Sequence, residues 1–462
     1  MPVTLLPATE QLALLRRGAI TPLELAEEHI RQIERLNPQL NALADFDADR
    51  VRAQATAVRA GALAGLPVTV KSSISVTGYR CEIGSVLNRG SVPEKNAVLV
   101  DRLLTAGAVI LGTTNCPEFL MAYETENQLH GSTRNPWNPE HTAGGSSGGE
   151  AAAIAAGLSA AGLGSDSGGS VRVPAHFTGI CALKPTAGRF PAEGHLPPCH
   201  GPFAFLGSIG PMARTVGDLS LLFAVLSGRD ATDPNSAPVE HRAVSRQEAQ
   251  QVPVGWFDDD GRTPVTAETR SAVRDAAVAL ERRGFRVERF RPQALEAARK
   301  LWWTFFMQCG AILYEPTIRG REDELSVTFR DYLTLARSEK PLTADALLAA
   351  WVESDVVRGN LLEEMRAFPI LLCPVCSIPA FRPSERAWTV EGQRVTYLDA
   401  MRYAQWFNLL GGPAAVVPVS QSAEGLPIGV QIAGRPYADE LVLAVAAAVE
   451  EAFGYRPPPM AL

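Results

Sequence analysis

The sequence predicts an α/β fold, in which helices surround a parallel or mixed β-sheet within one large domain. Three observations lead to this prediction. Short apolar runs typical of buried strands alternate with helical segments along much of the 462-residue chain. Hydrophobic residues make up 46% of the chain and charged residues 20%, which is the composition of a protein with a core. No stretch approaches the roughly 20 uninterrupted apolar residues of a membrane-spanning helix.

The N-terminal part, residues 1–60, predicts two amphipathic helices that cover the sheet. Thr21–Glu24 has the order of residues of a helix-capping box, with proline in the first helical position. Apolar residues then recur at helical spacing as far as Pro38, where we expect the helix to end. A second helix is expected at 47–59. His29 is expected on the solvent-facing side of the first helix.

The next segments alternate between strand and helix patterns. An apolar run ending in a lysine, 66–71, predicts a strand, and 97–106 predicts the helix that follows it. A strand is expected at 109–112 and an alanine-rich helix at 150–161. Beyond a polar surface connection at 228–251, the same patterns predict strands at 252–257, 285–290, 370–372, 414–418 and 429–432, and helices at 266–283, 438–453 and through most of 297–367.

Charge and cysteine content exclude some classes of protein. The net charge of −7 argues against a nucleic acid as the main partner. Seven cysteines are too few for a disulfide framework in a chain of this length, and the first residues lack a basic segment ahead of an apolar one. The expected location is therefore the reducing cytoplasm.

Two glycine- and serine-rich clusters, 144–149 and 164–170, flank the alanine-rich helix. One helix and a return segment can bring Ser146 and Ser170 together. Successive N–H groups at Gly168, Gly169 and Ser170 can form a concave site for an anion, such as the oxyanion of a reacting carbonyl. A flexible surface linker is the alternative, but linkers seldom alternate with alanine-rich helices.

Other serine and glycine motifs fit less well. A phosphate-binding P-loop requires a lysine and a serine or threonine after the glycines, and these are missing. A nucleophile elbow centred on Ser147 needs a preceding strand and a later histidine base, and no histidine follows His241. Lys71 is the best remaining base, because burial after an apolar strand would lower its pKa and leave a neutral amine. Alternatively, it is an ordinary lysine facing water.

The run from Ala143 to Arg189 resembles the signature sequence of the amidase signature family, in particular its fatty acid amide hydrolase branch. The run reads AGGSSGGEAAAIAAGLSAAGLGSDSGGSVRVPAHFTGICALKPTAGR. Further family motifs match Val70-Lys71 with Gly78, and segments 112–119, 210–214 and 425–431. Residues 64–228 and 369–455 are covered well, whereas the middle third is covered poorly.

The resemblance implies a Ser-Ser-Lys triad. Ser170 would be the nucleophile, Ser146 the bridging serine, usually on a cis peptide in this family, and Lys71 the base. The backbone N–H groups of Ser167, Gly168, Gly169 and Ser170 would form the oxyanion hole. Many members have an acidic residue after the lysine, where this chain has Ser72.

The resemblance also implies one α/β/α amidase domain over residues 1–462 with a mixed central sheet. Its parts would be the N-terminal helices 1–60, a signature core at 64–228, a variable helical pocket region at 297–367 and a C-terminal core at 369–455. No metal or organic cofactor would be needed, and the partner would be a small-molecule amide. Dimers are common in the family.

Several activities remain open at this point. Carboxamides are the expected substrates, and carbamates (urethanes), anilides and esters could react by the same mechanism. The amidase subunit of a glutamine-dependent tRNA amidotransferase, which works with partner chains, is an alternative from another class, and a non-catalytic binding protein is a third.

Three further features have both a structural and a functional reading. The aromatic patch 302–306 belongs either to the core or to the substrate pocket, and the proline-rich loop 190–210 could be a pocket lid. Cys373 and Cys376 form a lone C-x-x-C pair that we expect in the core.

Overall fold

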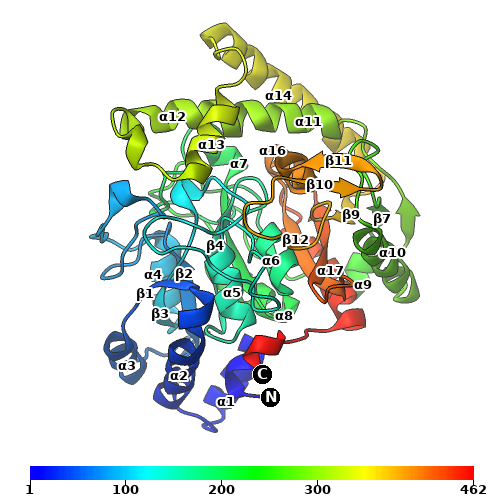
Figure 1. Cartoon of the computed structure of the whole chain (residues 1–462). Coiled ribbons are helices and arrows are strands. Elements are labelled where there is room, and N and C mark those ends of the chain that lie inside the picture. Colours follow the sequence, from blue (N-terminus) through cyan, green and yellow to red (C-terminus); the bar gives the residue numbers. More distant parts are fainter.

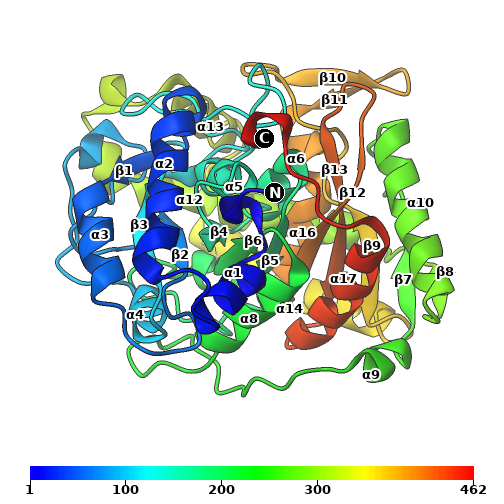
Figure 2. The same cartoon turned by 90° about the horizontal axis from the view of Figure 1, so that it is seen from below.

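The computed structural model describes all 462 residues and is built around an eleven-stranded sheet (Figures 1 and 2). The order of its strands is β1-β3-β2-β4-β6-β5-β12-β13-β9-β7-β8. Two further strands, β10 (Ala387–Val390) and β11 (Gln393–Thr396), form a separate hairpin. The strands of the large sheet are β1 (Leu43–Phe46), β2 (Pro67–Lys71), β3 (Val109–Thr114), β4 (Ala161–Asp166), β5 (Cys181–Lys184), β6 (Ser208–Ala213), β7 (Val254–Trp256), β8 (Val287–Arg289), β9 (Ile370–Pro374), β12 (Ala414–Gln421) and β13 (Pro427–Gly434).

The sheet is mixed, which confirms the expected fold class. β2 runs parallel to both β3 and β4, and β7 runs parallel to both β8 and β9. The centre of the sheet, from β4 through β6, β5, β12 and β13 to β9, is antiparallel. Because β2 and β4 are parallel neighbours, Lys71 and Asp166 both stand at the carboxyl ends of strands on one edge of the sheet.

Helices cover both faces of the sheet, so the strands are apolar on both sides. On one face, Val68, Val70 and Ile110 pack in the largest apolar cluster, together with residues of helices that cross the same face. These helices are α4 (Val98–Thr105), α8 (Val216–Leu226), α10 (Ala267–Arg282) and α17 (Asp439–Phe453). Alternate residues point to the other face, where Val109 and Leu111 meet a different cluster.

The opposite face has three groups of helices, and the central group positions the glycine- and serine-rich loops. Its helices α5 (Gly148–Ala155) and α6 (Arg172–Thr178) are entirely buried. The first group comprises α2 (Pro22–Leu40) and α3 (Ala48–Thr56), whereas Ala8 and Leu12 of α1 (Ala8–Arg16) pack in the apolar cluster of the other face. The third group comprises α11 (Leu295–Trp302), α12 (Cys309–Ile318), α13 (Val327–Ala336), α14 (Ala344–Glu364), α15 (Tyr397–Ala400) and α16 (Arg402–Leu410). Two short helices, α7 (Pro202–Leu206) and α9 (Arg246–Gln250), lie in the connections between strands.

The third group extends the molecule beyond the sheet. In Figure 1, α11, α12, α13 and α14 lie together at the top, on the far side of α7 and α16 from the termini. A π-helical segment, Trp303–Gln308, joins α11 to α12 without a break. The expected helical region at 297–367 is therefore confirmed. The chain termini lie side by side at the opposite end of the molecule (Figures 1 and 2).

Three predictions from the sequence need correction. The helix α2 continues past Pro38 to Leu40 and ends where Asn41 adopts a left-handed conformation. The alanine-rich helix ends at Ala155, before Gly157 with a φ of +73°, so the segment from Ala161 onward forms strand β4. His29 is fully buried rather than exposed, and its ring contacts the Leu158 carbonyl and the Gln11 side chain at 3.1 Å each.

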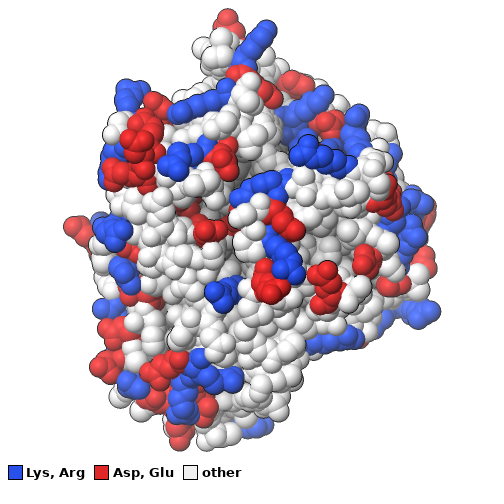
Figure 3. Space-filling view, in the orientation of Figure 1, with Lys and Arg blue, Asp and Glu red and all other residues white.

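The surface is mixed in charge on the face drawn in Figure 3. Lysine and arginine side chains are interspersed with aspartate and glutamate, and uncharged surface lies between them. No helix combines the length and the apolar character that crossing a bilayer requires. Cys373 and Cys376 are fully buried, as expected for core residues.

Candidate active site

Lys71 is the last residue of β2 and is fully buried, which overturns the alternative of a lysine facing water. Its Nζ lies 2.7 Å from Ser146 Oγ and 3.2 Å from Ser165 Oγ. As an ammonium, the lysine donates to both hydroxyls. As a neutral amine, it can donate to one of them and accept a proton from the other.

The environment of Lys71 favours the neutral form. Burial lowers its pKa from 10.5 to about 8, against the opposing effects of Cys116, Asp166 and Glu150. Glu150 is itself fully buried and accepts hydrogen bonds from the hydroxyls of Thr69 and Thr114. Burial raises the pKa of Glu150 to about 8. A carboxyl group therefore stands near the lysine although Ser72 follows it in the sequence.

Replacing Glu150 tests this electrostatic coupling. The Glu150 carboxylate raises the pKa of Lys71, so Glu150→Gln should lower that pKa. The amide oxygen of the glutamine can accept from one of the two threonine hydroxyls, and its NH2 group can donate to the other. If neutral Lys71 is the active form, the rising limb of kcat/KM against pH moves to lower pH by up to about one unit, equivalent to about 1.4 kcal/mol. Glu118→Gln removes another buried carboxylate that accepts from Ser85 and serves as the control. A limb that stays in place, or moves to higher pH, would contradict the coupling.

Ser146 and Ser170 come from the two glycine- and serine-rich loops, which the structure places side by side. The Ser147 N–H donates to the Ser170 carbonyl at 3.1 Å, which links the loops directly. The peptide bond between Gly145 and Ser146 is cis. Ser146 is buried, Ser170 is partly exposed, and both line one cavity. The two side chains are not hydrogen-bonded to each other in this structure; of the three, Lys71 and Ser146 are in direct contact.

The loop before Ser170 is held from three sides. Trp302 Nε1 donates to the Ser167 carbonyl and Tyr123 Oη to the Gly168 carbonyl, both at 2.8 Å. The N–H of Gly169 donates to Asp166 Oδ1 at 2.8 Å. Gly169 has a φ of +119°, which favours glycine.

These contacts decide which N–H groups of the loop remain for an anion. Of the four that the sequence predicts, the one on Gly169 is already donated to Asp166. The N–H groups of Ser167, Gly168 and Ser170 have no acceptor within the protein. Trp302 fixes the Ser167 carbonyl. Because the peptide bond is planar and trans, the Gly168 N–H of the same peptide points in the opposite direction.

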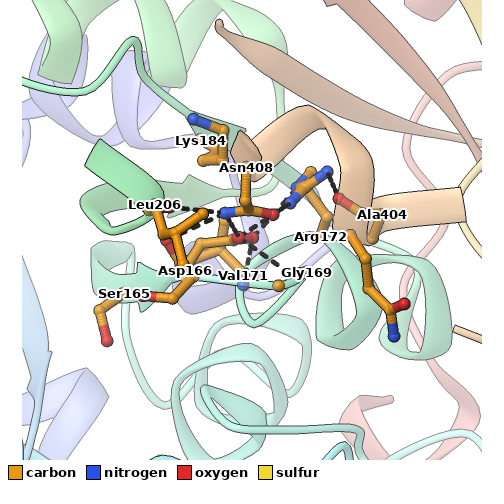
Figure 4. A network of polar contacts seen from close by, with 12 residues as sticks. Ser165, Asp166, Gly169, Val171, Arg172, Lys184, Leu206, Ala404 and Asn408 are labelled. Carbon is orange, nitrogen blue, oxygen red and sulfur yellow. Dashed lines mark hydrogen bonds and ion pairs between the residues drawn. The ribbon is translucent and has the colours of Figure 1, made fainter. Parts of the chain in front are cut away.

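A buried ion pair supports the loop from behind (Figure 4). Asp166 and Arg172 are both fully buried, with an Arg172 Nη2–Asp166 Oδ1 distance of 2.8 Å. Arg172 also donates to the side chains of Gln431 and Asn408 and to the Ala404 carbonyl. The carboxylate accepts from the N–H groups of Gly169 and Val171 and from Asn408 Nδ2. The pKa of Asp166 is lowered by Arg172 despite its burial, so the carboxylate stays ionised.

Breaking this pair should destabilise the protein strongly. Arg172→Met leaves Asp166 as an uncompensated buried charge, which costs about 3–5 kcal/mol. Arg366→Met removes an exposed partner of Glu363 and should change the free energy of unfolding by less than about 0.5 kcal/mol. Denaturant unfolding of both variants and the parent measures the two costs. A loss for Arg172→Met no larger than for Arg366→Met would refute the supporting role of the pair.

Two cavities meet at Ser170. The inner one, of about 40 Å³, is bordered by Ser146, Ser165 and Ser167 and by residues of the 190–210 loop, which are His195, Pro197, Cys199 and Phe203. The outer one, of about 610 Å³, is bordered by Gly168, Ser170 and a largely aromatic wall. From the aromatic patch, Trp302, Trp303 and Phe306 line the outer cavity, whereas Phe305 is buried in the core. Both regions that the sequence left open therefore contribute to the site.

The wall of the inner cavity contains one histidine, His195. The sequence alone did not indicate it as a site residue. Its Nδ1 lies 2.8 Å from the Pro197 carbonyl, so this nitrogen carries the proton, and Nε2 lies 3.4 Å from Ser73 Oγ. Burial lowers the pKa of His195 to about 4, which keeps the ring neutral. No group of three or more histidine, cysteine, aspartate and glutamate side chains is arranged to hold a metal ion.

Comparison with known proteins identifies the family of the chain. The family model described as Amidase matches residues 24–443. The chain belongs to the amidase family. It is 33% identical to the indoleacetamide hydrolase of Bradyrhizobium diazoefficiens, over 98% of this chain and 87% of that protein. It is also 33% identical to the acylamidase of Rhodococcus erythropolis, over 96% and 95%. One subunit of the glutamyl-tRNA(Gln) amidotransferase of a Synechococcus species is 32% identical, over 96% of each chain.

Solved structures show the same architecture. A structure of 6-aminohexanoate cyclic dimer hydrolase with its substrate superposes on this amidase with a TM-score of 0.88, at 29% identity, and covers 99% of this chain and 100% of its own. A fatty acid amide hydrolase structure has a TM-score of 0.87 at 24% identity, over 98% of this chain and 86% of its own, and shows the shared fold alone. The protein is therefore an amidase, an enzyme that hydrolyses carbon–nitrogen amide bonds.

Proposed function

We propose that this amidase cleaves carboxamides through an acyl-enzyme on Ser170, with Ser146 and Lys71 as its proton relay. The observation that carries the proposal is the fully buried Lys71, whose amine has a lowered pKa and touches Ser146 beside the cavity that Ser170 lines. A lysine in this state is a competent base for a serine relay. The N–H groups of Ser167, Gly168 and Ser170 would stabilise the oxyanion, and Gly169 would position them.

The reaction has two stages. Neutral Lys71 takes the proton of Ser146, Ser146 takes that of Ser170, and Ser170 Oγ attacks the carbonyl carbon. The proton then returns through Ser146 to the leaving nitrogen, because an amine leaves poorly unless it is protonated. Water enters, loses its proton to the same relay, and releases the carboxylic acid from Ser170. In this structure the side chains of Ser146 and Ser170 are not hydrogen-bonded, so the relay closes as the substrate binds.

Carbamates, anilides and esters present the same kind of carbonyl and are alternative substrates. The 32% identity to one amidotransferase chain keeps a second class open, in which partner chains would be required. The outer cavity favours the free hydrolase, since its aromatic wall suits a bulky apolar group better than the charged groups of glutamine. We further propose that residues 1–462 act as one amidase domain, as a monomer or homodimer. All seven cysteines are free, which fits the cytoplasm.

The experiment that tests the proposal is covalent labelling with a fluorophosphonate, followed by intact and peptide mass spectrometry. We expect one adduct per chain, located on Ser170, and no adduct after the chain has been unfolded. An adduct on another residue would refute the nucleophile assignment. No adduct on the folded chain alone, but one after a partner chain has been added, would favour the amidotransferase class.

A further inference from the structure

The three free N–H groups of the loop before Ser170 are oriented by different parts of the molecule. In the peptide that ends at Ser170, the Gly169 carbonyl accepts from the Val173 N–H at 2.7 Å, in the first turn of α6. The peptide that ends at Ser167 begins at Asp166, the last residue of β4, so the sheet orients it. Two of the three N–H groups are therefore fixed by regular structure next to the loop.

The third peptide, between Ser167 and Gly168, has no such support from its neighbours in the chain. Its carbonyl accepts one hydrogen bond, from Trp302 Nε1 at 2.8 Å, which comes from a residue 135 positions away in the sequence. Gly168 has no side chain to restrict the rotation of this peptide. The indole N–H of Trp302 is thus the group that keeps the Gly168 N–H turned away from the indole and free for an oxyanion.

The indole ring is itself held in place. Trp302 is only 1% exposed, and its ring stacks on Phe306 with 4.8 Å between the ring centroids and 12° between the planes. The edge of the indole packs on Gly168, where a Cβ atom would lie 2.7 Å from Trp302 Cζ2. Because Phe306 borders both cavities, Trp302 connects the cavity wall to the loop.

We propose that Trp302 is a positioning residue of the oxyanion hole, whose indole N–H orients the Gly168 N–H toward the reacting carbonyl oxygen; this inference rests on the proposed function. As Ser170 Oγ bonds to the carbonyl carbon, one electron pair of the C=O bond moves onto the oxygen. The Gly168 N–H donates to this oxyanion while the Ser167 carbonyl accepts from Trp302. Trp302 acts through the peptide that it holds and not on the reacting atoms.

The first test is Trp302→Phe, which removes the N–H donor and keeps an aromatic ring beside Phe306. With phenylacetamide as substrate and ammonia release as the measure, kcat should fall about 10- to 100-fold, somewhat less than the loss of a complete oxyanion donor. KM should change less than about threefold, because the lost interaction is made in the transition state. A kcat within about twofold of the parent would overturn the inference.

Trp351→Phe makes the same chemical change elsewhere and is the matched control. Trp351 lies on α14, packs on Phe205 and Phe305, and borders neither cavity. Its replacement should leave kcat and KM as they are in the parent. An equal fall of kcat in Trp351→Phe and Trp302→Phe would trace the effect to general loosening of the helical region and overturn the inference.

A pair of inhibitors separates positioning from a merely structural role. Benzyl trifluoromethyl ketone can bond to Ser170 Oγ through its carbonyl carbon, which creates an oxyanion while the Ser170 proton passes to the relay. The corresponding alcohol has nearly the same shape but forms no oxyanion. Trp302→Phe should weaken inhibition by the ketone by the same factor by which it lowers kcat, and leave inhibition by the alcohol unchanged. Equal weakening of both would show that the indole only shapes the cavity and would overturn the inference.

An isosteric change covers the case in which Trp302→Phe folds poorly. Incorporation of 3-benzothienylalanine at position 302 keeps the bicyclic shape and replaces only the N–H by sulfur, so the same selective loss is expected. Parental kcat in this variant would overturn the inference, although a fluorophosphonate would still label Ser170. A parent that neither hydrolyses amides nor is labelled would instead contradict the proposed function itself.

Discussion

Replacing Ser170 with alanine should reduce kcat/KM for an amide substrate by about 10⁴- to 10⁶-fold, since in the proposed mechanism Ser170 forms the acyl-enzyme. The remaining activity would come from the oxyanion donors and from substrate binding, which do not depend on the hydroxyl. Ammonia release measures the loss. The variant should fold normally, because the Ser170 side chain makes no hydrogen bond in this structure and is partly exposed.

Ser208→Ala is the matched control for this experiment. Ser208 is buried in β6, and its hydroxyl has no hydrogen-bond partner, so its removal should leave both activity and stability close to those of the parent. Retention of more than about one-hundredth of the parental kcat/KM in Ser170→Ala would show that another residue forms the covalent intermediate, or that hydrolysis is direct.

The sequence predicted the part of the site that depends on local motifs. Lys71 follows an apolar strand, and Ser146 and Ser170 stand in glycine-rich clusters on either side of one helix, so both local pattern and family resemblance identify them. The strand β4 was missed because the serines and glycines of Ala161–Asp166 resemble a loop, although all six residues are buried between β2 and β6. Tertiary packing here outweighs the low strand propensity of glycine.

The contacts that shape the loop could not be predicted in the same way. Trp302 and Tyr123 hold the carbonyls of Ser167 and Gly168, and they lie far from the loop in the sequence. No local pattern distinguishes an aromatic residue that donates a hydrogen bond to a loop from one that fills the core. The occupied N–H of Gly169 was likewise unpredictable, because it depends on the orientation of Asp166, which Arg172 and Asn408 fix.

His29 shows the limit of periodicity as a guide to burial. The apolar stripe of α2 gives the orientation of the helix, but residues beside the stripe are buried wherever a neighbouring segment covers them. Leu158 and Gln11 supply hydrogen-bond partners for both ring nitrogens. A buried polar side chain with satisfied partners has the same sequence pattern as an exposed one.

Replacing Lys71 with methionine should reduce kcat/KM by about 10²- to 10⁴-fold, the usual contribution of a general base. It should also change the pH dependence. In the parent, burial lowers the pKa of Lys71 to about 8, so the neutral amine forms as the pH rises through this value. The parental kcat/KM should therefore increase with pH up to about 8 and then level off. In Lys71→Met this limb should disappear, and fluorophosphonate labelling of Ser170 should become slower.

Lys184 provides a matched control within the same molecule. It is also fully buried at the end of a strand, β5, and burial lowers its pKa to about 7, but it borders neither cavity. Lys184→Met removes a buried lysine from the centre of the sheet and can cost stability, yet the limb near pH 8 should remain. If instead this limb persists in Lys71→Met, or vanishes in Lys184→Met while the variant remains folded, the base that activates Ser170 is not Lys71. The comparison separates the chemistry of one amine from the general effect of removing a buried charge.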